Sequence, residues 1–444
     1  MIDVVWGIGG MAGLLVIALA LSSNRKAIRW RTVLAALGLQ VGFGVIVLSW
    51  SLGQRGLEAA SRGVQAVIDS SREGIGFLFG PVLPEEGDGV VFAFQVLPVI
   101  VFFAALTAVL YHWGVLQRVV SWLGGALGRL LGTSHAESVN AAANIFVGQT
   151  EAPLVIRPFV SGLSRSGLFA VMVGGLSTVA GSVLVGYSLL GAPLEYLIAA
   201  SFMAAPGALL MAKIIVPEDD PDAVAREREL VSSTSSARAA GAGDSSADVP
   251  PAEVEDDARE EEDRGEAESD GLHHRNTIDA AASGAADGLR LAATIGAMLL
   301  AFISLIALIN LAVGGVGGWF GQEDLTFEQI LGWIFAPVMS MIGVPWAEAA
   351  EAGSFLGQKV VVNEFVAFTG FGPEIGSYSE KTAAIITFAL TGFANLGSLG
   401  ILLGGLGGIA PERRPDIAAL GLRAVLAATL ANLMSAAIAG ILIG

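Results

Sequence analysis

Two short polar stretches interrupt apolar sequence and decide how this chain folds. The first is Gly148-Gln149-Thr150-Glu151-Ala152-Pro153, and the second is Asn363-Glu364-Phe365. Each places a carboxylate inside a segment apolar enough for a lipid bilayer, where an ionisable side chain costs roughly 2.5–3.5 kcal/mol on insertion scales. Because such groups are kept where they hold a polar solute, the two stretches predict a transporter rather than a structural membrane protein.

The composition is that of a polytopic, all-α membrane protein. The 444 residues are 54% hydrophobic and 15% charged, and their 58 glycines suit close approach of membrane helices. A spanning helix needs about 20 apolar residues. The sequence predicts eight transmembrane helices, at Val4–Leu21, Val33–Trp50, Val90–Tyr111, Leu168–Leu190, Leu194–Val216, Gly288–Val313, Ala383–Ile409 and Ile417–Ile443.

Charge around the first predicted helix indicates its orientation. Basic residues follow that helix, from Arg25 to Arg31, and none precedes it, which is the reverse of a cleaved signal peptide. The positive-inside rule then places the N-terminus outside the cell. With eight spans the C-terminus lies outside as well. We therefore expect an uncleaved, multi-pass protein of the inner membrane.

The two interrupted segments predict re-entrant helical hairpins. Glu137–Leu163 is split at Gly148–Pro153 and Trp346–Gly370 is split at Asn363-Glu364, so each arm is roughly half the bilayer core in length. Matching breaks in two halves of a chain are typical of transporters built as inverted repeats around a binding site. Three amphipathic segments predict interfacial helices, at Arg55–Phe79, Val115–Leu131 and Leu325–Ile342.

Most of the net charge of −17 lies in one low-complexity stretch. Between Glu218 and Arg275 there are 19 acidic and 6 basic residues, which predicts a disordered cytoplasmic linker. The rest of the chain is nearly neutral, so the charge indicates no nucleic-acid partner. Four parts result: N-terminal scaffold helices (1–134), a first repeat half (135–216), the linker (217–275) and a second half (276–444).

The polar motifs resemble, in order, those of the concentrative nucleoside transporter family. Gly148–Pro153 is similar to that family's first-hairpin motif, and Asn363–Ala367 to its second. Gly392-Phe393-Ala394-Asn395 with Ser398 resembles the following helix, and Ile278–Ala282 is also family-like. The resemblance covers nearly everything except the acidic linker. It implies homotrimers in which a hairpin-containing transport domain moves across a fixed scaffold.

The residue chemistry agrees with a nucleoside, which joins an amide-edged base to a sugar diol. Gln149 both donates and accepts hydrogen bonds, as a base edge requires, and the Glu364 carboxylate can accept two hydroxyls. Val183 and Phe393 would flank the base. The resemblance assigns base contacts to Gln149, Thr150 and Glu151, and ribose contacts to Glu364, Asn395 and Ser398.

Each assignment has a structural alternative. Gln149 and Thr150 would equally cap a broken helix end, and Glu151 would pair with Arg157. Asn395 and Ser398, three residues apart on one predicted helix face, would serve as ordinary helix–helix contacts.

The driving ion is expected to be sodium. No nucleotide-binding Gly-rich motif is present, which argues against ATP as the energy source. The resemblance implies a sodium site made of Asn144, Thr178 and the carbonyls of Val147 and Val179. Proton coupling through Glu151 is the alternative.

The predicted function is therefore sodium-driven import of nucleosides such as uridine. The alternatives are a proton-coupled or an equilibrative nucleoside transporter, and a gating-type membrane sensor without net transport. The sequence holds no nucleophile–base motif, so we expect no enzymatic activity.

Overall fold

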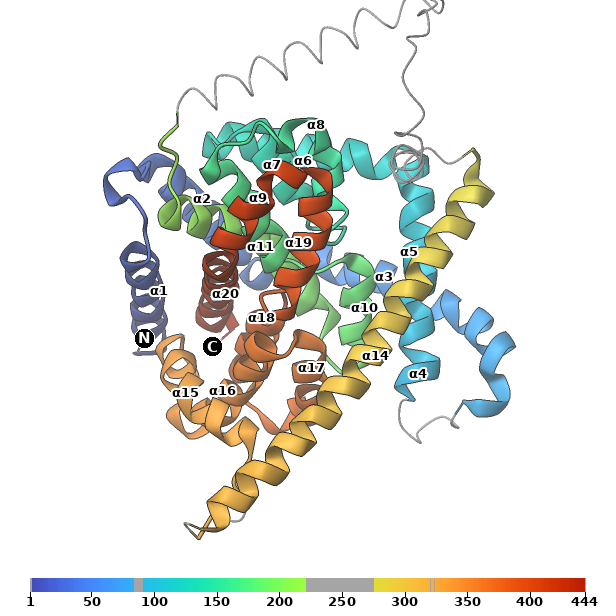
Figure 1. The fold of residues 1–444 in the computed structure, drawn as a ribbon, viewed down its shortest axis with the longest axis vertical. Coiled ribbons are helices and arrows are strands. Elements are labelled where there is room, and N and C mark those ends of the chain that lie inside the picture. Colours follow the sequence, from blue (N-terminus) through green and yellow to red (C-terminus); the bar gives the residue numbers. More distant parts are fainter. Residues whose placement is uncertain (1, 84–90, 221–274, 320, 323, 444) are drawn as a thin grey trace, which may run out of the picture.

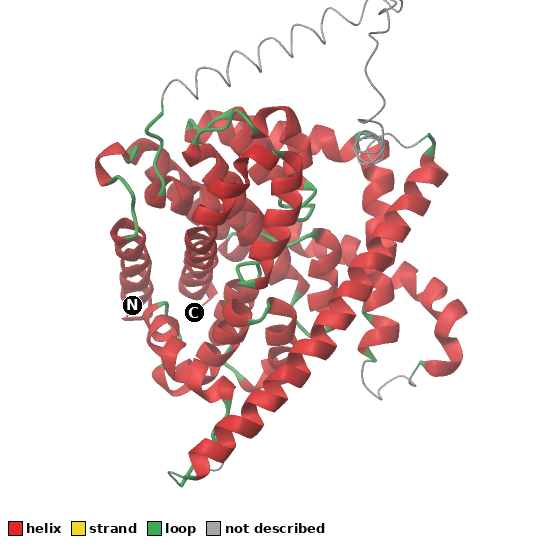
Figure 2. Ribbon diagram, in the orientation of Figure 1, coloured by secondary structure: helices red, strands yellow, loops and turns green. Residues whose placement is uncertain are grey.

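The computed structural model describes residues 2–83, 91–220, 275–319, 321–322 and 324–443, and these residues form helices and loops without any strand (Figure 2). The all-α prediction is confirmed. The N-terminal part contains α1 (Ile2–Ala20), α2 (Trp30–Gly44), α3 (Ser51–Phe79), α4 (Phe92–Gln95) and α5 (Leu97–His112).

The remaining helices form two series with the same order of elements. The first contains α6 (Val115–Leu131), α7 (His135–Ala143), α8 (Arg157–Val160), α9 (Arg165–Ser177), α10 (Gly181–Leu189) and α11 (Leu194–Ile215). The second contains α14 (Thr277–Gly318), α15 (Phe327–Met341), α16 (Trp346–Val361), α17 (Glu364–Glu374), α18 (Glu380–Leu390), α19 (Gly397–Ile409) and α20 (Arg414–Ile443). Together with α5, the first series matches the second: a long helix, an amphipathic helix, a hairpin, a broken helix and a final long helix.

The two series run in opposite directions, which confirms the inverted repeat (Figure 1). Helix α11 ends beside the start of α9, because the Ser166 hydroxyl donates to the Val216 carbonyl at 2.7 Å. Helix α20 begins at that same end, because Arg413 Nη1 donates to the carbonyls of Ser161 and Leu163 at 3.0 and 2.7 Å. Both chain termini lie at the other end of the bundle.

Six helical stretches of the described residues, counting α9 with α10 as one, are long and apolar enough to cross a membrane. This differs from the predicted eight in two places. The apolar part of α1, Val4–Ala20, is shorter than a full span, and the predicted helix Ala383–Ile409 is broken into α18 and α19. Helix α14 is longer than predicted, and its 42 residues extend over about 63 Å.

The break between α9 and α10 and the break between α18 and α19 form hydrogen bonds with each other. The apolar run of sequence across each break therefore did not reveal it. Helix α9 ends at Ser177 and Thr178 is extended, so the predicted helix Leu168–Leu190 is also interrupted. At the other break Gly392 adopts a φ of +153°, a conformation that favours glycine. The Phe393 amide donates to the Thr178 carbonyl at 3.2 Å, so backbone groups freed at one break are satisfied by the other.

Helices α5 and α14 form a closely packed pair beside the hairpin-bearing bundle (Figure 1). The pair depends on small residues: a Cβ at Gly288 would lie 2.8 Å from Val101 Cα, and one at Gly284 would lie 2.8 Å from the Ala104 carbonyl oxygen. Such close contact is the usual way for membrane helices to associate. The pair forms one wall of the cavity described below.

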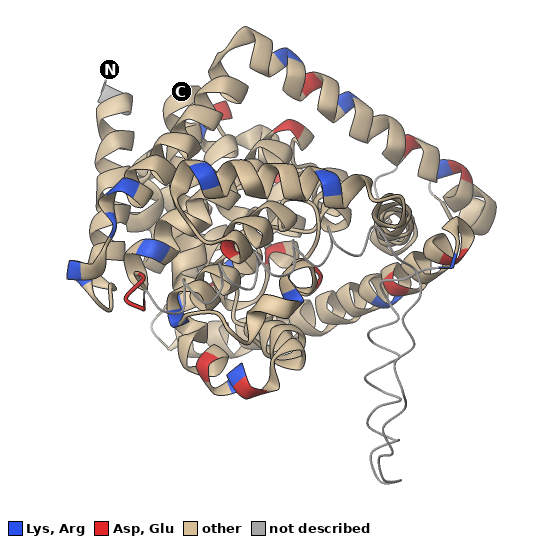
Figure 3. Ribbon diagram, turned by 90° about the horizontal axis from the view of Figure 1, so that it is seen from above, with Lys and Arg blue, Asp and Glu red and all other residues tan. Residues whose placement is uncertain are grey.

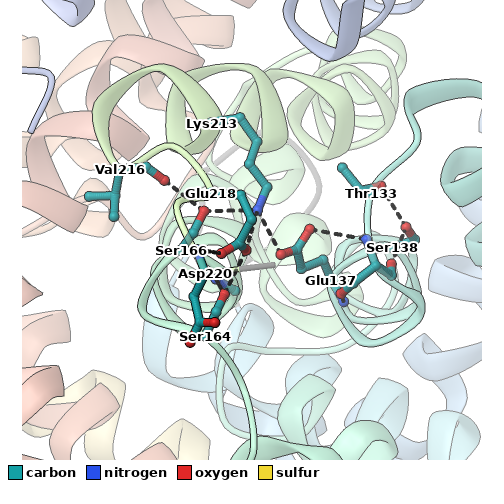
Figure 4. A network of polar contacts seen from close by, with 11 residues as sticks. Thr133, Glu137, Ser138, Ser164, Ser166, Lys213, Val216, Glu218 and Asp220 are labelled. Carbon is teal, nitrogen blue, oxygen red and sulfur yellow. Dashed lines mark hydrogen bonds and ion pairs between the residues drawn. The ribbon is translucent and has the colours of Figure 1, made fainter. Parts of the chain in front are cut away.

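Charged side chains are widely spaced over the helices (Figure 3), and one buried cluster stands out among them (Figure 4). Lys213 Nζ lies 2.7 Å from Glu137 Oε1 and 2.9 Å from Ser166 Oγ. Glu218, at the start of the linker, accepts from the Ser164 hydroxyl at 2.6 Å. The cluster joins the start of the first hairpin to the end of α11. Residues 221–274 lie outside the described residues, so their predicted disorder and the four-part division stay predictions.

Candidate functional site

A cavity of about 450 Å³ lies between the hairpin-bearing helices and the α5–α14 pair. Its volume falls within the roughly 300–1,000 Å³ typical of small-molecule sites. Both hairpin tips, the start of α10 and the break between α18 and α19 form one wall. All eight residues predicted to bind substrate line it: Gln149, Thr150, Glu151, Val183, Glu364, Phe393, Asn395 and Ser398.

Glu364 is fixed at the tip of the second hairpin as the first residue of α17. Asn363 caps this helix, since its Oδ1 accepts from the Val366 amide at 2.9 Å. Glu364 accepts from the Tyr187 hydroxyl at Oε1 and from Asn395 Nδ2 at Oε2, both at 2.9 Å. A carboxylate offers about four lone-pair sites. The Glu364 carboxylate therefore keeps capacity for a further donor from the cavity.

Tyr187 is a site residue that sequence reasoning missed. It is fully buried on α10, with its ring stacked on Phe368 at a centroid distance of 4.5 Å and edge-on to Phe365 at 4.8 Å. Its hydroxyl donates a hydrogen bond to Glu364, although Tyr187 itself does not line the cavity. A tyrosine within an apolar span carries a signal that was available, because a buried phenol needs a hydrogen-bond partner.

The first hairpin places its polar tip in the cavity without using it as a helix cap. Gln149 is 5% exposed, and its Oε1 has no hydrogen-bond partner among the residues that the structure describes. Glu151 is exposed toward the cavity, and among the described residues it forms no ion pair with Arg157. Neither structural alternative for this motif is therefore seen. Gly175 of α9 lets the tip approach, since a Cβ there would lie 2.9 Å from Gln149 Cβ.

Asn395 and Ser398 do not share a helix face, contrary to the prediction. Asn395 lies in the break before α19 begins, and its Oδ1 accepts from the Ser398 backbone amide at 2.7 Å. Because its Nδ2 also donates to Glu364, Asn395 joins the second hairpin to the start of α19. Phe393 is half-buried and Val183 is buried in the cavity wall. The break brings these residues together, whereas a continuous helix would separate them.

The residues predicted to hold sodium lie where the first hairpin meets the first broken helix. Asn144 is fully buried at the end of α7. Its Nδ2 donates to the Asn140 carbonyl at 2.9 Å, but its Oδ1 has no hydrogen-bond partner within the described ranges. The Gly181 amide donates to the Phe146 carbonyl at 3.0 Å, which brings the segment before Val147 beside the break at Thr178 and Val179. An unpaired buried amide oxygen beside freed carbonyls suits a small hard cation.

The opposite wall of the cavity supplies polar groups that were not predicted. Helix α5 contributes Tyr111, and α14 contributes Asp287 and Thr294. Three carboxylates line the cavity, those of Glu151, Asp287 and Glu364, and no Lys, Arg or His does so among the described residues. An acidic residue one position before the predicted span Gly288–Val313 was the available signal for Asp287.

Comparison with known families covers most of the chain. The profile described as Na+ dependent nucleoside transporter C-terminus matches residues 196–440, and its N-terminal counterpart matches residues 9–82. A third profile, described as nucleoside recognition, matches residues 93–194 and so includes the first hairpin. The chain belongs to the concentrative nucleoside transporter family.

Individual members of the concentrative nucleoside transporter family match over almost the full length. An uncharacterized transporter of Bacillus subtilis, YutK, is 51% identical over 99% of this chain and 100% of that protein. The nucleoside permease NupC of Helicobacter pylori is 45% identical over 98% and 97%. The solved structure of CNTnw in an inward-facing substrate-bound state is 49% identical, with a TM-score of 0.85 over 99% and 98% of the two chains.

Membership in the concentrative nucleoside transporter family establishes the general activity. The chain is a multi-pass membrane protein that transports nucleosides, and it is not an enzyme. The predicted arrangement of two interrupted segments around a binding site agrees with that activity, because the carboxylates of Glu151 and Glu364 line the same cavity.

Proposed function

We propose that this chain is a sodium-coupled symporter that imports nucleosides across the inner membrane by alternating access. The observation that carries the proposal is the position of Glu364, which is held by Tyr187 and Asn395 at the wall of a cavity between two helical bodies. Movement of the hairpin-bearing body past the α5–α14 pair would expose that cavity to one side and then to the other.

The proposed substrate contacts follow from the chemistry of the cavity wall. Glu364, Asn395 and Ser398 bind the ribose, because a carboxylate already oriented by two donors accepts sugar hydroxyls in charge-assisted bonds. The unpaired Oε1 of Gln149 accepts from the base edge, beside Thr150 and Glu151. Val183 and Phe393 supply apolar surface to the base. Uridine has all the groups that these residues require.

The charge of the cavity favours nucleosides over nucleotides. A phosphate group would enter a space lined by three carboxylates, with no cation among the described lining residues to pair with it. Like charges at short range in a partly desolvated site are strongly unfavourable. We therefore expect uridine monophosphate neither to be transported nor to compete with uridine.

Sodium fits the residues around Asn144. The unpaired Asn144 Oδ1, the Thr178 hydroxyl and the carbonyls of Val147 and Val179 would hold the ion, which supplies positive charge between the first hairpin and α9. The family profiles are described as Na+ dependent, in agreement with this ion. A proton carried by Glu151 is the competing proposal, because this carboxylate faces the cavity without an ion-pair partner among the described residues.

The proposed orientation places the linker in the cytoplasm and both termini outside. The end of the bundle where the linker starts also contains the loop after α1, because the Ser23 amide donates to the Ile215 carbonyl at 2.9 Å. Arg25, Lys26 and Arg413 lie at this end, as the positive-inside rule requires of a cytoplasmic face. We further propose a homotrimer, which light scattering of the detergent-solubilised protein would measure.

Uptake of labelled uridine into proteoliposomes tests the proposal, with sodium and proton gradients imposed separately. An inward sodium gradient is expected to drive accumulation, and uridine monophosphate in excess is expected not to reduce it. Accumulation driven only by a proton gradient would assign the coupling to Glu151 instead. Uptake of uridine that never exceeds equilibrium under either gradient would identify an equilibrative transporter, and failure to take up any nucleoside would favour the sensor.

A further inference from the structure

Lys359 is a buried cation that is not among the residues lining the proposed transport site. It lies on α16, in the first arm of the second hairpin, and is 0% exposed. Within the described part of the chain no ion pair joins it to a carboxylate. Its ammonium donates instead to the Ala389 carbonyl at 2.7 Å and to Asn432 Oδ1 at 2.8 Å. Neutral oxygens therefore compensate a charge whose burial is costly.

Those oxygens belong to the second helix break. Ala389 is the next-to-last residue of α18, so its carbonyl is among those left without an intrahelical donor at the negative end of the helix. Asn432 of α20 links the two breaks: its Nδ2 donates to the Ser177 carbonyl at 2.7 Å and to the Thr391 carbonyl at 2.9 Å. Lys359 thus places a positive charge where the second hairpin meets the second broken helix.

In the first half of the repeat, the first hairpin also meets a broken helix, α9, but no cationic side chain among the described residues is placed there. Asn144 ends the first arm of the first hairpin and lies against the last turn of α9, since a Cβ at Gly174 would be 3.4 Å from Asn144 Nδ2. There the buried Asn144 Oδ1 has no hydrogen-bond partner in the part of the chain that the structure describes. Asn144 precedes the hairpin carboxylate Glu151 by seven residues, and Lys359 precedes Glu364 by five. The first half leaves the Asn144 Oδ1 unpaired, whereas in the second half the Lys359 ammonium donates to the oxygens at the break.

We propose that the Lys359 ammonium is a tethered cation, which fills in the second half the place that a sodium ion takes in the first. This rests on the proposed sodium coupling. Two helix ends with negative partial charge meet at the centre of the repeat, and each needs a cation. Because the second one is supplied covalently, the transporter couples a single sodium ion to each nucleoside, and Lys359 keeps the second break assembled.

The first test is the sodium-to-uridine coupling ratio of the unmodified protein, measured in proteoliposomes from the membrane potential at which net uridine flux reverses. We expect a ratio of one. A ratio of two would overturn the tethered-cation proposal while leaving sodium coupling intact. Uptake that does not respond to sodium would instead refute the proposed function, and the inference about Lys359 with it.

The second test replaces the tethered ammonium with a free one. Lys359→Ala is expected to lower uridine uptake about tenfold or more, because it leaves the oxygens of Ala389 and Asn432 without a donor. Ethylammonium chloride should restore uptake and raise the Tm of the purified variant, relative to the same concentration of choline chloride. The matched control is Leu356→Ala, which opens a buried apolar space one turn earlier on α16 and should show no ethylammonium response.

The outcome that contradicts the proposal is equally specific. If ethylammonium changes neither the Tm nor the uptake of the Lys359→Ala variant, or changes both to the same degree in the Leu356→Ala variant, then Lys359 is a packing residue only. The thermal measurement needs no transport activity, so a Lys359→Ala protein that folds but does not transport still decides the matter.

Discussion

At the residue scale, the fixed orientation of Glu364 contributes more to the proposed substrate binding than its burial does. Tyr187 and Asn395 each donate to a different carboxylate oxygen, so the side chain is held in one position before substrate arrives. Such preorganisation reduces the ordering that binding would otherwise require. Sequence reasoning identified the carboxylate and Asn395 but not the phenol, because Tyr187 lies 177 residues away and only the fold brings it beside Glu364.

Glu364→Gln should reduce uridine uptake about tenfold to a hundredfold at saturating sodium, because hydrogen bonds to a charged group contribute roughly 1.5–3 kcal/mol each. The glutamine amide NH₂ would also face the Tyr187 hydroxyl or Asn395 Nδ2, which are donors themselves. Tyr187→Phe, which removes one supporting bond and keeps the ring packing, should show a smaller loss. Initial rates in proteoliposomes measure both variants, and uptake by Glu364→Gln at the rate of the unmodified protein would refute the ribose role.

Asn144→Ala should raise the sodium concentration for half-maximal uptake about tenfold, because it removes the unpaired buried oxygen proposed as a sodium ligand. Uptake at saturating sodium should remain near that of the unmodified protein. Ser201→Ala is the control, since within the described part of the chain this buried hydroxyl on α11 bonds only in its own helix, to the Leu197 carbonyl at 3.0 Å. Sodium titrations of uridine uptake distinguish the two, and equal half-saturation values would argue against a sodium role for Asn144.

At the scale of elements, the paired helix breaks create the site. Each break converts a spanning helix into two halves and turns residues that would face neighbouring helices toward the cavity. Asn395 illustrates this, since it bonds Glu364 only because α18 ends at Leu390 and α19 starts at Gly397. The breaks were not predicted, because Gly, Ala, Thr and Leu keep the sequence apolar across them. Their stabilising contacts come from the other half of the chain.

Gly392→Ala tests the second break. Gly392 has a φ of +153°, and a Cβ there would lie 2.8 Å from the Ser177 carbonyl oxygen and 2.8 Å from Asn432 Nδ2. The resulting strain should lower the free energy of unfolding by about 1–3 kcal/mol and reduce uptake. Gly400→Ala on α19 is the matched control, since a Cβ there meets nothing within 4 Å. Thermal unfolding in detergent compares them, and equal Tm values for the two variants would show that the break tolerates a side chain.

At the scale of the whole molecule, the inverted repeat separates a hairpin-bearing body from the α5–α14 pair, with the cavity between them. The chain uses one helix, α14, for both the closely packed pair and the wall that contains Asp287. The acidic linker joins the two halves and begins at a fixed point, where Glu218 bonds Ser164 beside Lys213.

Deletion of residues 232–270 should leave the rate of uridine uptake within about twofold of the unmodified protein. None of the residues that line the cavity or the proposed sodium site lies in this range, and the linker start around Glu218 remains. Surface changes away from such features usually have small effects. Uptake assays with protein quantified in the liposomes measure the result. A large loss of transport with normal expression would give the linker a role beyond connection.

The sequence by itself determined the class of molecule, the two hairpins and the repeat, and its resemblance to a known family singled out eight of the residues that line the cavity. The two hairpin carboxylates follow from local causes, since polar groups in apolar segments are costly unless they face a wet cavity or a partner. Tertiary structure decided the breaks at Thr178 and Gly392, the support of Glu364 by Tyr187, and the burial of Lys359 against Ala389 and Asn432. Each of these depends on groups from distant parts of the chain meeting at depth in the bundle. Periodicity and composition reflect only residues that are close along the chain, so they do not predict these long-range contacts.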